Sequence, residues 1–237
     1  MNPETLLVIV PVRGRRANCE RILASFRETA AVADIMFISD PDDQDTYADM
    51  DWGDAIHAVM DPRGSFITKL NHGADAFTGV YDAFMAVGDS NVFITPGWDT
   101  ILLGVLADEL GGSGWVYPEN RRRNDVPEMW LASADVVDAL GWFAPPYVGM
   151  YYGDNIIAEL GKRAGMIRYV PAALIEHRHY SVFPGVAHDQ TYKDAEDTWG
   201  GRDLQAFQEW RVVQAANEVA VLRRRFNPDR QWVLDRV

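Results

Sequence analysis

The sequence has a single cysteine, Cys19, and no apolar run close to the roughly 20 residues that cross a bilayer. One cysteine excludes a disulfide framework and a multi-cysteine zinc site, and it suits a reducing interior. The start of the chain, Asn2-Pro3-Glu4 ahead of a short apolar stretch, lacks the basic residues of a secretory signal. We therefore expect a cytoplasmic protein without a membrane span.

Positive charge and several well-known catalytic motifs are also scarce. Lys and Arg number 22 against 35 Asp and Glu, which gives a formal net charge of −13 at pH 7. This balance argues against an extended nucleic-acid-binding surface, because affinity for phosphate backbones comes mainly from clustered Lys and Arg. No phosphate loop, G-x-G-x-x-G fingerprint, H-E-x-x-H pair or G-x-S-x-G elbow occurs. Kinase, dehydrogenase, zinc-protease and α/β-hydrolase functions therefore lose their support.

What the chain does have is an alternation of strand-like and helix-like segments. Predicted strands cover residues 6–10, 34–39, 55–60, 83–87, 115–117, 129–131 and 167–175. Predicted helices cover residues 17–30, 65–79, 98–110, 134–140, 154–163 and 204–225. This order predicts an α/β fold, a Rossmann-type, mostly parallel central sheet flanked by helices, with a C-terminal helical extension. We expect one main domain over residues 1–180, with residues 181–237 forming a loop and an amphipathic helix packed on it.

Three of the predicted strands end in residues that can carry chemistry. Pro11-Val12-Arg13-Gly14-Arg15-Arg16 follows the first strand, Ser39-Asp40-Pro41-Asp42 the second, and Gly88-Asp89-Ser90-Asn91 the fourth. Ligands of open α/β sheets bind at the carboxyl ends of parallel strands. We therefore predict that Arg13, Asp40 and Asp89 gather around one pyrophosphate-sized cleft, with basic groups facing carboxylates.

At these positions the sequence resembles the GT-A glycosyltransferases, especially the family 2 type with small relatives in actinobacteria and their phages. The resemblance extends over residues 6–180 and rests on motifs in a fixed order: LLVIVPVRGR, FISDPDD, TKLNHGA, AFMAVGDSNVF, TPGWD, WLAS, GWF, YYGDN and IEHRH. It implies a GT-A fold and the transfer of a sugar from a nucleotide-diphosphate donor.

The resemblance also implies which residues hold the nucleotide. The loop after the first strand and the acid that ends the second would bind the base and ribose, so these roles fall on Pro11, Val12, Arg13, Arg15 and Asp40. Lys69 and Asn71, in the TKLNHGA stretch, would approach the nucleotide or diphosphate. For Lys69 a solvated position on a helix is the alternative.

A metal site is implied by Asp89-Ser90-Asn91, which stands where the family carries a D-x-D motif. Asn91 still offers a carbonyl oxygen to Mg²⁺ or Mn²⁺, although the loss of one charge should weaken binding. A late His completes the metal ligands in the family, so His177 is the candidate and His179 its substitute. The alternatives are a tight turn after a buried strand for the first pair, and a packed, hydrogen-bonded side chain for the histidines.

Asp154, in Tyr152-Gly153-Asp154-Asn155, matches the acid that relatives place at the start of a helix. An inverting transfer needs a carboxylate to remove the proton of the acceptor hydroxyl, and a helix N-terminus favours the ionised form. The alternative is that Asp154 only caps the helix.

The sequence therefore predicts a glycosyltransferase that uses a UDP- or GDP-sugar and Mn²⁺ or Mg²⁺. The acceptor is a hydroxyl group of a glycan, a protein or a hydroxylated phage DNA base, and nucleic acid enters only in that role. The alternatives are a nucleotidyltransferase and a sugar-nucleotide-binding module without turnover, which the Asp-Ser-Asn departure keeps open.

Overall fold

The computed structural model describes residues 3–227. These residues form an eight-stranded sheet with helices packed against it. Its strand order is β3-β2-β1-β4-β7-β6-β8-β5. The strands are β1 (Leu6–Pro11), β2 (Asp34–Ser39), β3 (Ile56–Val59), β4 (Ala83–Ala86), β5 (Asn91–Phe93), β6 (Trp115–Glu119), β7 (Trp130–Ser133) and β8 (Ile167–His177).

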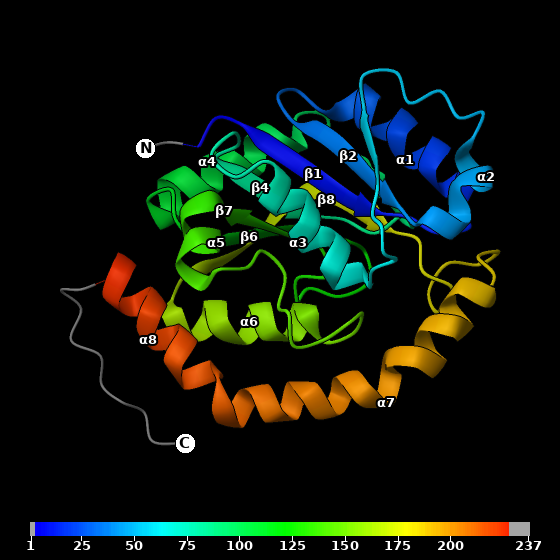
Figure 1. Cartoon of the computed structure of the whole chain (residues 1–237). Helices are drawn as coiled ribbons and strands as arrows, with labels where there is room; N and C mark the ends of the chain where they lie inside the picture. Colours follow the sequence, from blue (N-terminus) through cyan, green and yellow to red (C-terminus); the bar gives the residue numbers. More distant parts are fainter. Residues whose placement is uncertain (1–2, 228–237) are drawn as a thin grey trace.

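Helices cover both faces of the sheet (Figure 1). They are α1 (Arg16–Thr29), α2 (Gln44–Tyr47) after the 3₁₀ turn Pro41–Asp43, α3 (Phe66–Ala76), α4 (Trp98–Leu110), α5 (Ala134–Leu140), α6 (Gly153–Ala164), α7 (Gln190–Val213) and α8 (Ala215–Phe226). Every residue of β1 is buried, and its side chains alternate between two core clusters. Leu6, Val8 and Val10 pack with α1 and α4, whereas Leu7 and Ile9 pack with α3, α5 and α6. This period of two explains the continuous apolar run, since a strand covered on both faces has no solvent side.

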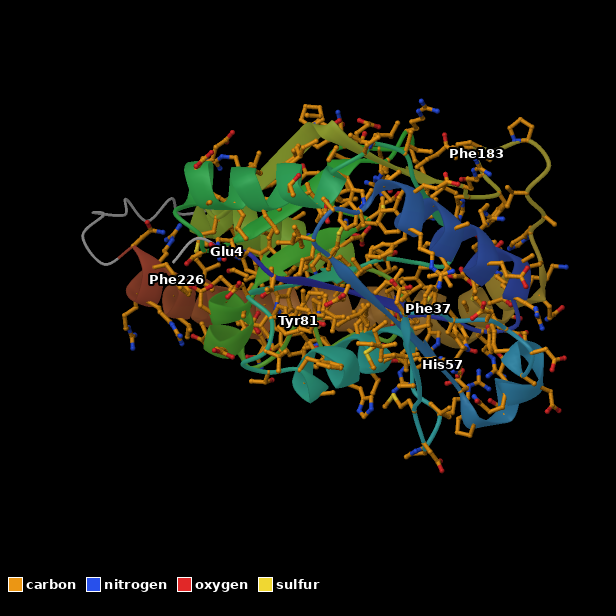
Figure 2. All side chains as sticks on the ribbon, turned by 90° about the horizontal axis from the view of Figure 1, so that it is seen from above. Glu4, Phe37, His57, Tyr81, Phe183 and Phe226 are labelled. Carbon is orange, nitrogen blue, oxygen red and sulfur yellow. The ribbon has the colours of Figure 1, made fainter. Side chains whose placement is uncertain are left out.

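The parallel pairs set the position of the strand ends. β3, β2, β1 and β4 are neighbours and run parallel, so their carboxyl ends share one edge. Figure 2 shows Glu4, just before β1, on the same side of the molecule as Phe226, and Phe183, in the loop after β8, on the opposite side. The predicted α/β fold with a central sheet flanked by helices is confirmed, and antiparallel neighbours enter the sheet with β7 and β5.

β5 is an element that the sequence pattern does not reveal. It has only three residues and directly follows the Gly88-Asp89-Ser90 turn. Its antiparallel partner is the end of β8, in a register that places Asn91 opposite His177. This pairing brings two distant motifs side by side.

The C-terminal helices differ from the prediction of one helix over residues 204–225. α7 begins at Gln190, where the side chain of Asp189 accepts a hydrogen bond from the Tyr192 N–H. The helical path breaks at Gln214, and α8 follows. Figure 1 shows α7 passing along the outside of the molecule and α8 turning back against α5 and α6. The predicted C-terminal part reaches residue 237, so its end lies outside the described residues. Within residues 3–227, no helix combines the length and apolar character that crossing a bilayer requires.

Candidate functional site at the carboxyl edge of the sheet

Asp40, directly after β2, is a buried carboxylate that faces three cations, of which Lys69 is buried and Arg13 and Arg63 are partly exposed. Its Oδ2 atom lies 2.8 Å from Lys69 Nζ, 2.9 Å from an Arg13 nitrogen and 4.0 Å from Arg63 Nε. Asp40 is 0% exposed and Lys69 4%, so both charges are held away from water. Burial lowers the pKa of Lys69, and the hydrogen bond to Asp40 opposes that shift. Asp40 Oδ1 is also buried, and within the described residues it has no hydrogen-bond partner.

Lys69 reaches this cluster because α3 starts in the right place. Ser65 caps the helix by accepting a hydrogen bond from the Thr68 N–H. One turn along, Lys69 Nζ also lies 3.4 Å from the carbonyl oxygen of Val12, the residue that follows Pro11 at the end of β1. The sequence-predicted residues Pro11, Val12 and Lys69 therefore lie together with Asp40. Lys69 is buried in an ion pair, which differs from the solvated helical lysine of the alternative.

Asn71 does not join that cluster. Its Nδ2 donates to the Ala144 carbonyl, and its Oδ1 accepts from the N–H groups of Phe143 and Ala144. Both ends of the amide therefore fasten the loop before α6. In the structure Asn71 therefore anchors this loop, and its approach to the nucleotide stays a prediction.

Arg15 joins three parts of the site. One of its nitrogens lies 3.3 Å from Asp89 Oδ1, in the turn after β4. Two others donate to Asp189 at 2.6 and 2.9 Å, and the guanidinium stands 4.0 Å above the centre of the Tyr192 ring. The loop after β1, the turn after β4 and the start of α7 thus converge on one side chain. Together with the Arg13–Asp40 contact, this places Arg13, Asp40 and Asp89 along one edge of the sheet.

Asn91 and His177 face each other across the β5–β8 pair, and Asp89 lies two residues before Asn91. Asn91 Nδ2 donates to the Gly88 carbonyl at 2.9 Å. Its Oδ1 is buried and, among residues 3–227, without a hydrogen-bond partner. Burial also raises the pKa of Asp89, an effect that the charge of Arg15 opposes. The strand pairing therefore sets the Asn91 amide opposite His177, while the Asp89 carboxylate is paired with Arg15.

The two histidines have different surroundings. His177 Nδ1 lies 2.8 Å from an oxygen of Glu128, in the loop between β6 and β7. His179 lies beyond the end of β8, with Nδ1 2.7 Å from Ser181 Oγ. Burial and the nearby Arg122 charge lower the pKa of His179 to about 4. The rings are neighbours, with centroids 5.4 Å apart.

Asp154 is the second residue of α6 and accepts a hydrogen bond from the Asn155 N–H at 2.9 Å. Burial raises its pKa to about 6; the charge of Glu128 adds to the shift, and Arg123 opposes it. A carboxylate with this pKa is mostly ionised at neutral pH and still binds a proton well enough to act as a base.

The loop before Asp154 is held by α7. The buried carboxylate of Asp203 accepts hydrogen bonds of 2.8–2.9 Å from the N–H groups of residues 149–151. Tyr152 has a left-handed backbone with φ of 66°, which is costly for a residue other than glycine. Its ring stacks on Phe207 of α7, with centroids 5.4 Å apart. The conformation that leads into the Asp154 helix is therefore imposed by the C-terminal segment.

The predicted metal ligands Asp89, Asn91 and His177 carry the donor atoms that a divalent cation prefers. Asp89 and Asn91 supply oxygen, and His177 supplies nitrogen, donors that suit Mn²⁺. The buried, unpartnered Asn91 oxygen is the observation that favours a ligand here. Within the described residues, no three His, Cys, Asp or Glu side chains form a metal-holding group. A cation would thus depend on the amide as its third protein ligand.

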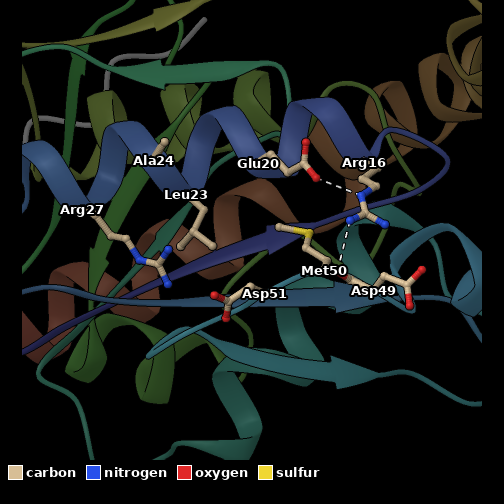
Figure 3. Close-up of a pocket in the computed structure, with 8 residues that line it drawn as sticks. All are labelled: Arg16, Glu20, Leu23, Ala24, Arg27, Asp49, Met50 and Asp51. Carbon is tan, nitrogen blue, oxygen red and sulfur yellow. Dashed lines mark hydrogen bonds and ion pairs between the residues drawn. The ribbon is translucent and has the colours of Figure 1, made fainter.

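A surface pocket lies apart from the predicted nucleotide and metal residues. About 360 Å³ in volume, it is bordered by α1 and residues 49–51 (Figure 3). Arg16 crosses it, donating to Glu20 at 2.8 Å and to the Asp49 carbonyl at 3.2 Å. None of its lining residues is a predicted site residue.

Comparison with solved structures identifies the fold. GalNAc-T7, solved with UDP, GalNAc and Mn²⁺, matches 95% of this chain with a TM-score of 0.62 and 13% identity, and this chain covers 55% of it. Glucosyl-3-phosphoglycerate synthase from Mycobacterium tuberculosis, solved with Mn²⁺, UDP-glucose and phosphoglyceric acid, matches 74% of the chain with a TM-score of 0.53 and 14% identity, and 72% of its length is covered. The chain has the GT-A fold, as the sequence motifs predicted. No protein-family model and no curated protein sequence matches it.

The sequence motifs did not identify Glu128, Asp189 or Tyr192. Glu128 belongs to a polar loop without a motif, so no local signal marks it. Asp189 had a signal, because an aspartate before a helix is a favoured N-cap.

Proposed function

We propose that this chain is a glycosyltransferase that moves a sugar from a UDP- or GDP-sugar to a hydroxyl acceptor, with a divalent cation. The GT-A fold supports this function, and both solved neighbours described above hold UDP or a UDP-sugar together with Mn²⁺. The observation that carries the proposal is the convergence on one sheet edge of the Asp40 cluster and the Arg15–Asp89 pair. A cytoplasmic location remains a prediction from the single cysteine.

Asp40 and its cations would bind the nucleoside. The unpartnered Oδ1 of Asp40 can accept a hydrogen bond from an N–H of the base or an O–H of the ribose, which would remove the cost of a buried acceptor without a partner. Lys69 and Arg13 hold the other oxygen and so fix the direction of the carboxylate. The backbone of Pro11 and Val12 would form the adjacent wall, and Arg15 would meet the diphosphate.

Asp89, Asn91 and His177 would hold the cation, with His179 as the substitute for His177. When bound, Mn²⁺ or Mg²⁺ would neutralise charge on the departing diphosphate. The protein's own contribution is to fix an amide and an imidazole across two paired strands, which limits their movement. Arg15 adds a permanent positive charge beside Asp89.

Asp154 would accept the proton of the acceptor hydroxyl as the sugar is attacked, with inversion at the anomeric carbon. Its pKa of about 6 keeps most molecules ionised at pH 7 to 8. The positive charge of Arg123 favours the ionised form of Asp154, and the negative charge of Glu128 disfavours it.

Isothermal titration with UDP and GDP, each with and without Mn²⁺, tests the donor assignment. We expect micromolar binding of one nucleotide with Mn²⁺, and clearly weaker binding by Asp40→Asn. The matched control is Asp108→Asn, an exposed aspartate on α4. Absence of micromolar binding under all four conditions would overturn the assignment.

Turnover tests the base and separates the alternatives. Release of UDP or GDP from sugar nucleotides should fall by about 10²-fold or more in Asp154→Asn, the usual size of a general-base contribution, and stay unchanged in Asp108→Asn. Turnover within a few-fold of the parent would remove Asp154 from the mechanism. Pyrophosphate release from a nucleoside triphosphate would favour a nucleotidyltransferase, and binding without turnover would favour the non-catalytic module.

A further inference from the structure

Glu128 is a buried carboxylate that receives hydrogen bonds from three sides. His177 Nδ1 lies 2.8 Å from Oε2, and Asn120 Nδ2 donates to the same oxygen at 3.1 Å. A guanidinium nitrogen of Arg122 donates to Oε1. The side chain of Glu128 is only 6% exposed. Of these three partners, only His177 belongs to a motif that the sequence analysis marked.

The identities of the partners fix the direction of the His177 hydrogen bond. Arg122 and Asn120 can only donate through the atoms that they present, so both carboxylate oxygens act as acceptors. His177 Nδ1 must then carry the hydrogen and donate it to Glu128. The proton of a neutral imidazole sits on one nitrogen only, and Nε2 is left with a lone pair.

A backbone hydrogen bond holds His177 and the loop that carries Glu128 in fixed positions relative to each other. The His177 N–H donates to the Asn120 carbonyl at 3.0 Å, which ties the end of β8 to the start of the β6–β7 loop. Asn120 Oδ1 accepts from the N–H groups of Arg122 and Arg123, each at 2.8 Å. Asn120 is 2% exposed, so the same buried side chain organises the loop and contacts Glu128.

We infer that Glu128 is the positioning residue that fixes the ring orientation and the Nδ1–H tautomer of His177, so that Nε2 is presented for a divalent cation. Histidine ligands of metals commonly donate their second ring nitrogen to a carboxylate, and loss of that partner typically weakens metal binding by about 10- to 100-fold. The tautomer follows from the contacts alone; only the role of Nε2 as a ligand rests on the proposed function.

The tautomer is measured without metal or substrate. In full-length ¹⁵N-labelled protein, two-bond ¹H–¹⁵N correlation spectra distinguish the nitrogen that carries hydrogen, and His177→Gln identifies the resonances. We expect Nδ1–H in the parent and a shift to Nε2–H in Glu128→Met, which removes the acceptor while preserving side-chain length. Nε2–H in the parent, or no change in the variant, would overturn the inference. The parent spectrum decides the matter even if the variant does not fold.

The matched control is Glu119→Gln. Glu119 is a carboxylate at the start of the same loop, but its partners are the Tyr169 hydroxyl and the Arg121 N–H. This variant should retain the tautomer of the parent. A tautomer change in Glu119→Gln as large as that in Glu128→Met would overturn the specific role of Glu128.

Mn²⁺ binding, followed by electron paramagnetic resonance of free Mn²⁺ in the presence of UDP, tests the consequence. We expect Glu128→Met to bind Mn²⁺ about 10- to 100-fold more weakly than the parent, with Glu119→Gln unchanged. Equal affinity in Glu128→Met and the parent would overturn the positioning role. A parent that binds no Mn²⁺ would overturn the proposed cation site, and the tautomer measurement would still decide what Glu128 does.

Discussion

Replacing Asp203 by asparagine should weaken the protein and slow its reaction through the loop that precedes Asp154. The Asp203 carboxylate is 1% exposed and accepts three backbone hydrogen bonds from residues 149–151. Oδ2 takes two of them and Oδ1 the third. The amide of asparagine can keep its oxygen at the Oδ2 position, but its NH₂ group then faces the Gly149 N–H.

The magnitude follows from these contacts. A buried donor without an acceptor costs about 1–3 kcal/mol, and the two remaining bonds lose the strength that a charged acceptor gives. We therefore expect a loss of about 2–4 kcal/mol in the free energy of unfolding. The left-handed backbone of Tyr152 makes the loop ready to relax once this hold is weakened. If Asp154 is the base that we propose, turnover should then fall by at least about 10-fold, because small displacements of a general base are costly.

Asp99→Asn is the matched control. The buried side chain of Asp99 also accepts three consecutive backbone N–H groups, those of residues 31–33, on one oxygen, and the Thr100 N–H on the other. The substitution therefore breaks the same kind of contact, at a different place in the fold. Urea unfolding followed by tryptophan fluorescence should show a similar loss of stability in both variants. Nucleotide release, measured where both are folded, should be slowed only in Asp203→Asn.

Two results would refute this reasoning. If Asp203→Asn unfolds at the same urea concentration as the parent, the three hydrogen bonds carry little energy. If Asp99→Asn loses as much turnover as Asp203→Asn, the effect is a general consequence of lower stability and the loop has no special role.

Two further predictions concern titration and the start of α7. The pKa of Asp154 in the folded protein, about 6, lies above that of an unfolded aspartate, so the parent should lose stability as the pH rises from about 4 to about 6. Asp154→Asn lacks this titration, so the melting temperature of the variant relative to the parent should be higher at pH 7 than at pH 4. A difference in melting temperature that stays constant with pH would contradict the raised pKa. Asp189→Asn should bind UDP about two- to fivefold more tightly in titration calorimetry, because Arg15 then has no partly exposed ion pair with Asp189 to give up when it binds a phosphate. Equal or weaker binding would show that Asp189 does not compete with the nucleotide.

Local pattern was sufficient for much of the fold. β2, α4 and α5 have the predicted bounds, because β-branched runs and helical spacing are properties of neighbouring residues. β5 was missed because three residues are too few to show the alternation of apolar and polar side chains that marks a strand. Its partner in β8 lies more than 80 residues away in the sequence. The start of α7 was placed too late, since Gly200 and Gly201 in its middle weaken the helical pattern.

The site was predictable where a motif marks it and hidden where only tertiary contact does. Asp40, Asp89 and Asn91 follow strands, so parallel topology alone places them on one edge. Asn71 belongs to a motif of the resembled family but is used to anchor a loop. Glu128 interacts with His177 across 49 positions of sequence, and no local pattern encodes such a contact.

The Arg15–Asp189 contact joins residues 174 positions apart, which has a consequence for biosynthesis. During translation the strands and every candidate metal ligand emerge from the ribosome before α7 is complete. Until then Arg15 has no Asp189 carboxylate to bind, and residues 149–151 have no acceptor from Asp203. Ordering of the loop that leads into Asp154 should accordingly be the last property that the growing polypeptide acquires, after its sheet is already assembled.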